Sequence, residues 1–183
     1  MLFRSVMATL ANAIAARGFK VDLVLAMAQG PYLKDVSESV RVVDLQAGRV
    51  IKALLPLARY LRRERPVAML SAMGHANVVA LMARKLARLP VQVVVSERGL
   101  ISGEHAIAQG AAAHLNYQLI RMLYPGADGI CTVSQAASQD LAAFARLPLH
   151  RVQTIYNPFD LPSIAQHAAR PMEHPWLQPG QPP

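Results

Sequence analysis

Short apolar segments alternate with longer amphipathic segments along most of this 183-residue chain. The short segments are rich in β-branched residues, and several are almost continuously hydrophobic, as strands buried on both faces of a parallel sheet are. They cover residues 21–26, 40–44, 67–71, 91–96, 129–133 and 152–156. This pattern predicts a mainly parallel sheet built from six strands.

The longer segments have apolar residues at helical spacing. We expect helices at residues 5–17, 49–63, 76–88, 106–123 and 135–145. Gly18 is a natural C-terminal cap for the first helix, and Pro66 blocks continuation of the second. Ser134 is a candidate N-cap for the last. The alternation of strands and helices predicts an α/β domain, Rossmann-like, with helices on both faces of the sheet.

Two irregularities concern the ends of the chain. The chain opens on a helix, although the first strand of a doubly wound sheet usually lies at its centre, so we expect that strand to be missing. The last fourteen residues, "RPMEHPWLQPGQPP", hold five of the thirteen prolines. We expect the domain to cover residues 1–170 and residues 171–183 to form a proline-rich linker or tail.

Composition and charge narrow the class of protein. A chain that is 53% hydrophobic and 16% charged fits a compact globular protein, and no apolar run reaches the roughly 20 residues that span a bilayer. The single Cys131 suits a reducing compartment, so we expect a cytoplasmic protein. The net charge of +8 favours an acidic partner such as an anionic membrane surface. Aromatic residues make up only 5%, which gives little support for nucleic-acid binding.

Known catalytic and cofactor motifs are absent from the sequence. There is no glycine-rich dinucleotide fingerprint, no P-loop and no nucleophile elbow, and the six histidines are scattered, so we expect neither a bound cofactor nor a metal site. The polar loops after the strands remain, because ligands of open α/β sheets gather at the carboxyl ends of the strands.

Three of these loops contain candidate residues. In "SAMGHAN", Gly74 permits a tight turn, and His75 and Asn77 offer polar groups to a ligand at the start of the next helix. The simpler alternative is that His75 or Asn77 only caps that helix. In "SERGLISGEHA", Glu97 and Arg98 follow a buried strand directly. This loop either contacts a ligand or is a solvated loop that carries charges without a binding role. Ser134 lies at a helix start, where backbone N–H groups bind anions, although a cap is the simpler role.

The final strand ends in "TIYNPFD". Pro158 restricts Asn157 to extended geometry and supplies no donor to a sheet, while Asn157 and Asp160 can bond to nearby backbone and stabilise a turn. The sequence therefore predicts a tight corner after the last strand.

Three segments together resemble family 4 glycosyltransferases: "VMATLANAIAARGFKVDLVLA" (6–26), "ADGICTVSQAASQDLAAF" (127–144) and "VQTIYNPFDLPSI" (152–164). They are similar to that family's helix–strand corner, its V-S strand end and its I-x-N-P-x-D corner. The resemblance implies one half of a GT-B fold. The full enzyme is implied to be a retaining, nucleotide-sugar-dependent hexosyltransferase of cell-surface polysaccharide or lipid-linked glycan synthesis.

The resemblance also assigns roles to residues. It makes Glu97 and Arg98 the leading acceptor or active-site candidates, followed by Gly74, His75 and Ser134. Asn157, Pro158 and Asp160 resemble the interdomain corner. The implied partners are a sugar or lipid-linked acceptor, a donor domain and, from the charge, an anionic membrane at its cytoplasmic face.

The chain departs from the family pattern at both ends. The E-x7-E segment of the donor domain and the glycine-rich first loop are missing from the 183 residues, so we expect this chain alone to be inactive. Two alternatives stay open: a catalytically inactive, stand-alone α/β binding module, and a fragment of a GT-B-like sugar-nucleotide epimerase.

Overall fold

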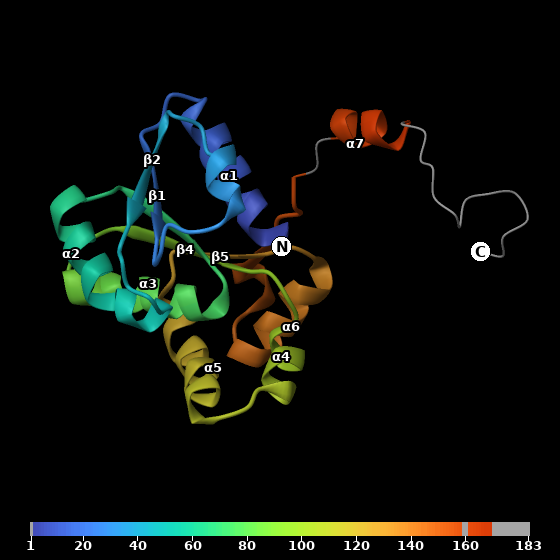
Figure 1. The fold of residues 1–183 in the computed structure, drawn as a ribbon. Helices are drawn as coiled ribbons and strands as arrows, with labels where there is room; N and C mark the ends of the chain where they lie inside the picture. The colour runs from blue at the N-terminus through green and yellow to red at the C-terminus, as the bar shows by residue number, and fades with distance from the viewer. Residues whose placement is uncertain (1, 159–160, 170–183) are drawn as a thin grey trace, which may run out of the picture.

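The computed structural model describes residues 2–158 and 161–169, which form an α/β fold (Figure 1). Its strands are β1 (Val21–Leu25), β2 (Val40–Asp44), β3 (Ala68–Ala72), β4 (Gln92–Glu97), β5 (Gly129–Thr132) and β6 (Val152–Thr154). Its α-helices are α1 (Leu2–Ala15), α2 (Leu54–Glu64), α3 (Gly74–Ala87), α4 (Ile101–Ile107), α5 (Ala111–Leu123), α6 (Gln135–Ala145) and α7 (Leu161–Ala168). Short 3-10 helices are η1 (Pro31–Asp35), η2 (Val50–Ala53), η3 (Tyr124–Gly126) and η4 (Leu149–Arg151).

The predicted α/β class is confirmed, and the six predicted strands are present with ends that differ by at most two residues. The single helix predicted over residues 106–123 is wrong, because α4 and α5 are separate. Gly110 precedes α5 with φ 86°, a left-handed conformation that interrupts an α-helix and that glycine adopts readily. Helix α7 was not predicted. The proline-rich segment 171–183 and Asp160 lie outside the described residues.

All the strand pairs are parallel, but they form two sheets. One sheet pairs β1 with β2, and the other has the order β3-β4-β5-β6. Within the described residues, β1 and β3 are therefore each paired on one edge. The single mainly parallel sheet that the sequence predicts is thus divided into two, and Leu70 of β3 is 41% exposed.

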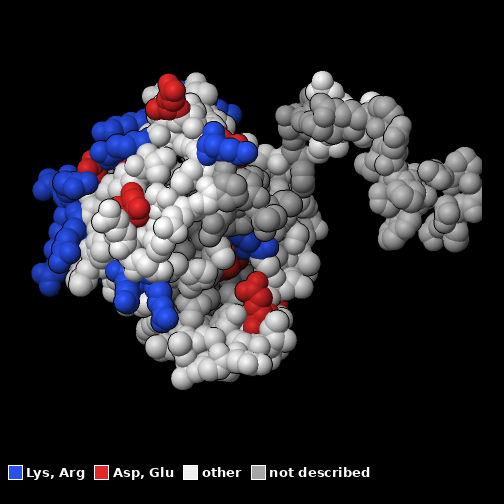
Figure 2. All heavy atoms as spheres, in the orientation of Figure 1, with Lys and Arg blue, Asp and Glu red and all other residues white. Residues whose placement is uncertain are grey.

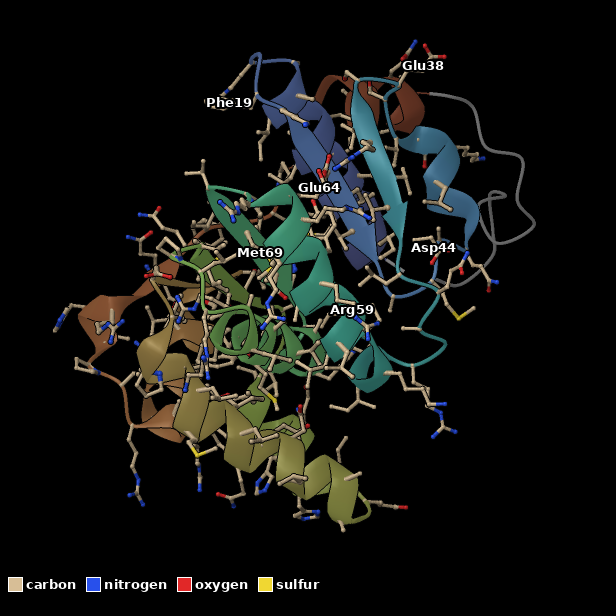
Figure 3. The ribbon with its side chains drawn as sticks, turned by 90° about the vertical axis from the view of Figure 1, so that its left-hand side faces the viewer. Phe19, Glu38, Asp44, Arg59, Glu64 and Met69 are labelled. Carbon is tan, nitrogen blue, oxygen red and sulfur yellow. The ribbon has the colours of Figure 1, made fainter. Side chains whose placement is uncertain are left out.

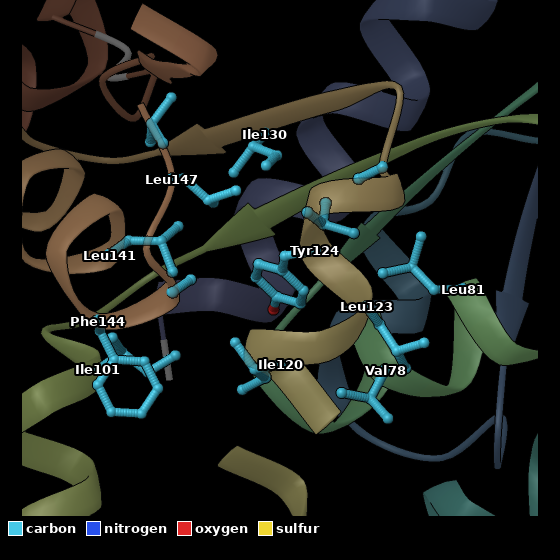
Figure 4. Close-up of a cluster of buried hydrophobic side chains, with 14 of the residues drawn as sticks. Val78, Leu81, Ile101, Ile120, Leu123, Tyr124, Ile130, Leu141, Phe144 and Leu147 are labelled. Atoms are coloured by element: carbon cyan, nitrogen blue, oxygen red, sulfur yellow. The ribbon is translucent and has the colours of Figure 1, made fainter. Parts of the chain in front are cut away.

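Two hydrophobic clusters hold the elements together. The larger one lies between β4, β5 and the helices α3, α5 and α6, and it surrounds Tyr124, which is fully buried (Figure 4). The smaller one lies between α2 and α3 and includes half-buried side chains from β1 and β2 as well as Met69 of β3 (Figure 3). Helices α2 and α3 thus connect the two sheets through apolar packing.

A polar network fixes the two-stranded sheet to α2. Asp22 of β1 accepts hydrogen bonds from Arg41 of β2 and, at 2.5 Å, from the Tyr60 hydroxyl of α2. Arg41 also lies 2.9 Å from Glu64 at the end of α2. The hydrogen bond from Arg41 is the main reason that the pKa of Asp22 is lowered. The charges of these elements are therefore paired where the elements meet.

Candidate functional site

The candidate residues lie at the edge of the larger sheet where its parallel strands end. Gly74 and His75 follow β3, Glu97 is the last residue of β4, Ser134 follows β5, and Asn157 follows β6. Because β3, β4, β5 and β6 are consecutive neighbours, their carboxyl ends form one continuous edge. The topology therefore brings together loops that lie up to about eighty residues apart in the chain.

Glu97 points into the protein rather than into solvent. It is 5% exposed, and its Oε1 accepts hydrogen bonds from the Tyr124 hydroxyl and, at 3.2 Å, from the Asn77 amide. Burial is the largest effect and raises the pKa of Glu97 to about 7, although the bonds from Tyr124 and Asn77 act in the opposite direction. The carboxyl of Glu97 is therefore poised to hold or release a proton near neutral pH.

Asn77 is fully buried and connects three groups. Its Nδ2 lies 3.0 Å from the Ser96 carbonyl and 2.9 Å from the Tyr124 hydroxyl, besides its bond to Glu97. The proposal that Asn77 or His75 caps the helix is wrong, because α3 begins at Gly74 and its N-cap is Met73. Asn77 therefore lies inside the first turn of α3, and its side chain faces the core. Its Oδ1 accepts no hydrogen bond from the part of the chain that the structure describes.

Gly74 allows α3 to approach Glu97 closely. A Cβ atom at this position would lie 3.3 Å from Glu97 Oε1 and 3.1 Å from Cδ1 of Ile120. Met73, just before it, has φ 82°, which is unusual for a residue other than glycine, and its N–H donates to the Ser96 carbonyl at 3.2 Å. His75 is exposed in the first turn of α3.

Arg98 points away from Glu97 and reaches the last corner of the sheet. Its Nη2 donates to Asn157 Oδ1 at 2.6 Å, and both residues are half-buried. Partial burial lowers the pKa of Arg98, but a guanidinium remains charged at any physiological pH. This contact joins the loop after β4 to the segment after β6, 59 residues away.

Ser134 is the N-cap that the sequence predicted: its hydroxyl accepts a hydrogen bond from the Ala137 N–H at 3.2 Å. Beside it, the hydroxyls of Thr132, Ser138 and Thr154 form a chain that connects β5, α6 and β6. Pro158 is exposed after Asn157. Polar contacts therefore also join β5, α6 and β6 at the part of the sheet edge next to Ser134.

Sequence reasoning missed Tyr124 and the buried role of Asn77. Tyr124 lies 27 residues from Glu97 in the chain, at the start of "YPG", a sequence that reads as a turn. The available signal was chemical, since a tyrosine in an apolar helix end must find a partner for its hydroxyl when buried. Among residues 2–158 and 161–169, no three His, Cys, Asp or Glu side chains gather as metal ligands would.

The loops that form this edge of the sheet lie within a part of the chain that matches a known protein family. The family model of Glycosyltransferase Family 4 matches residues 4–162. The chain belongs to glycosyltransferase family 4. No curated protein matches it.

Membership in glycosyltransferase family 4 gives the sheet edge a context. The family implies sugar substrates, and the α/β architecture with parallel sheets is consistent with one half of a GT-B fold. The match includes each loop described above, from Gly74 to Asn157. No helix among the described residues is long and apolar enough to cross a membrane.

Proposed function

We propose that this chain is the acceptor-binding domain of a retaining, nucleotide-sugar-dependent hexosyltransferase that acts in cell-surface polysaccharide or lipid-linked glycan synthesis at the cytoplasmic face of a membrane. A second domain binds the donor, and no cofactor is needed besides the donor substrate. The observation that carries the proposal is the contact between Arg98 and Asn157 at the carboxyl edge of the sheet.

Arg98 has the chemistry that an acceptor site requires. A guanidinium is planar and presents its donors in a fixed fork, which matches carboxylates, phosphates and pairs of sugar hydroxyls. Asn157 restricts the rotation of the Arg98 side chain, so that less conformational entropy is lost when an acceptor binds. Arg98 is therefore the residue that we expect to contact the acceptor.

Glu97 stabilises the backbone next to Arg98. Its carboxyl is bonded to Tyr124 of the core and lies against Gly74, so it fixes the end of β4 relative to the start of α3. Arg98 is the next residue, and its backbone position follows that of Glu97. We therefore assign Glu97 the role of a positioning residue, and not that of a group in contact with substrate.

The proposal is tested by ligand binding, which does not require the donor domain. Saturation-transfer difference NMR would compare a panel of alkyl glycosides and glycosyl phosphates with uridine diphosphate glucose. We expect binding of acceptor-type probes in preference to the nucleotide sugar. Arg98→Gln should weaken that binding by about tenfold, the usual loss when one charge-assisted hydrogen bond is removed.

Arg59→Gln is the matched control, because Arg59 is an exposed arginine on α2 (Figure 3) and should leave binding unchanged. Circular dichroism checks that each variant is folded. The proposal is wrong if no acceptor-type probe binds, if uridine diphosphate glucose binds as well as the acceptors, or if both arginine variants lose binding equally.

A further inference from the structure

Helix α5 presents an apolar face that the described parts of the chain leave exposed. Leu115, Leu119 and Met122 fall at helical spacing on this face, and Leu115 and Met122 are 59% and 66% exposed. Leu119 and Met122 line two shallow grooves, one on each side of the helix. We call this face, with both grooves, the α5 surface.

Basic residues flank the α5 surface on both sides. Lys85 and Arg88, from the end of α3, line one groove, while Arg121 and Arg146 line the other. All four are exposed, and none of the residues that line either groove is acidic. Arg121 is held in place, because its Nε donates to the Phe144 carbonyl at 3.0 Å and its guanidinium lies over the Phe144 ring.

Two of these arginines occupy backbone positions that favour glycine. Arg88 ends α3 with φ 56°, and Arg146 ends α6 with φ 54°, both in the left-handed region. Side chains other than glycine are strained in that conformation. Arg84 and Lys85 place two further cations in the last turn of α3, where they complement the helix dipole. Replacement of Arg88 or Arg146 by glycine would therefore remove the charge without adding backbone strain.

We propose that the α5 surface docks this domain on an anionic lipid surface, with Leu115 and Met122 inserted among the lipids and the four basic residues bound to the headgroups. The chemistry matches an interfacial helix, in which an apolar strip is bordered by lysine and arginine. Figure 2 shows further Lys and Arg side chains along the side formed by α2 and α3, outside the two grooves.

A protein partner fits this surface less well. The centres of protein interfaces are enriched in aromatic residues, and no aromatic residue lines either groove. A second copy of the chain would place the same four cations against one another without an acidic residue from the grooves to pair with them. The inference is independent of the proposed acceptor site, because the α5 surface shares no residue with it.

Vesicle flotation tests the proposal, since protein bound to lipid rises while aggregated protein does not. The chain should float with vesicles of equal parts phosphatidylglycerol and phosphatidylcholine, but not with pure phosphatidylcholine, and binding should weaken as salt is added. Arg88→Gly and Arg146→Gly should each lower the affinity about fivefold, since each basic residue near an anionic surface contributes about that factor. Met122→Gln should also lower it.

The glycine variants separate docking from folding. Relief of the left-handed strain should leave their resistance to urea unchanged or raised, so weaker flotation cannot result from unfolding. Arg65→Gly is the matched control, because Arg65 is an exposed left-handed arginine at the end of α2 that lines neither groove. Three outcomes would overturn the proposal: no flotation on anionic vesicles, an equal loss with Arg65→Gly, or a dimer in solution that Met122→Gln dissociates.

Discussion

Replacement of Glu97 by glutamine should change how the stability of this domain depends on pH. Glu97 is 5% exposed, and its burial raises the pKa to about 7, from an ordinary glutamate value of 4.5. The hydrogen bonds from Tyr124 and Asn77 offset part of this effect, and the nearby charge of Glu104 adds to it. Glutamine keeps the shape of the side chain but removes its titration.

The free energy of unfolding depends on pH because the folded and the unfolded chain bind different numbers of protons at Glu97. Below pH 4.5 the carboxyl is protonated in both the folded and the unfolded chain, so its contribution to stability is complete. Between 4.5 and about 7 the unfolded chain ionises while the folded chain retains its proton, so the free energy of unfolding falls as pH rises. Each unit of pKa corresponds to about 1.4 kcal/mol, so the whole loss is about 3 kcal/mol.

Urea denaturation followed by far-ultraviolet circular dichroism measures this effect between about pH 5 and pH 8. The other side chains are the same in both proteins, so the difference between Glu97→Gln and wild type isolates Glu97. As pH rises, the free energy of unfolding of the variant should increase by about 3 kcal/mol relative to that of the wild type. Glu104→Gln, at an exposed neighbour, should largely keep the wild-type slope. A difference that stays constant with pH would refute the reasoning.

Three further predictions concern the core, the sheet edge and catalysis. Tyr124→Phe removes a buried donor to Glu97 and should cost about 1–3 kcal/mol in the same urea assay while raising the pKa of Glu97 further; an unchanged midpoint contradicts this. Among the described residues, β1 and β3 each have one edge without a neighbouring strand, so the chain should self-associate in size-exclusion chromatography, and Leu70→Lys should reduce that association; a wild-type monomer at all concentrations argues against it. The chain alone should release no nucleoside diphosphate from a nucleotide sugar, and turnover that disappears with Arg98→Gln would contradict that expectation.

Local signals in the sequence indicated some of the residues that lie at this sheet edge. The loop after β4 stood out because polar residues follow "VQVVV" directly, and the cap at Ser134 follows from its place before an amphipathic run. The break at Gly110 was missed, because the apolar spacing of α4 continues into α5 and hides a single left-handed glycine. The sequence left open whether His75 or Asn77 caps the helix, because polar residues at a helix start often serve that purpose, whereas α3 begins at Gly74, before both.

The sequence by itself determined the strands, most helices, the parallel class of the fold and the edge where ligands of such sheets bind, because these depend on hydrophobic period and on chain order. The family could also be read from short motifs. Only the tertiary structure decided that Glu97 faces Tyr124 and that Arg98 faces Asn157, since these pairs are 27 and 59 residues apart. It also decided the burial that raises the pKa of Glu97, because desolvation depends on which elements pack over a residue and not on its neighbours in the chain.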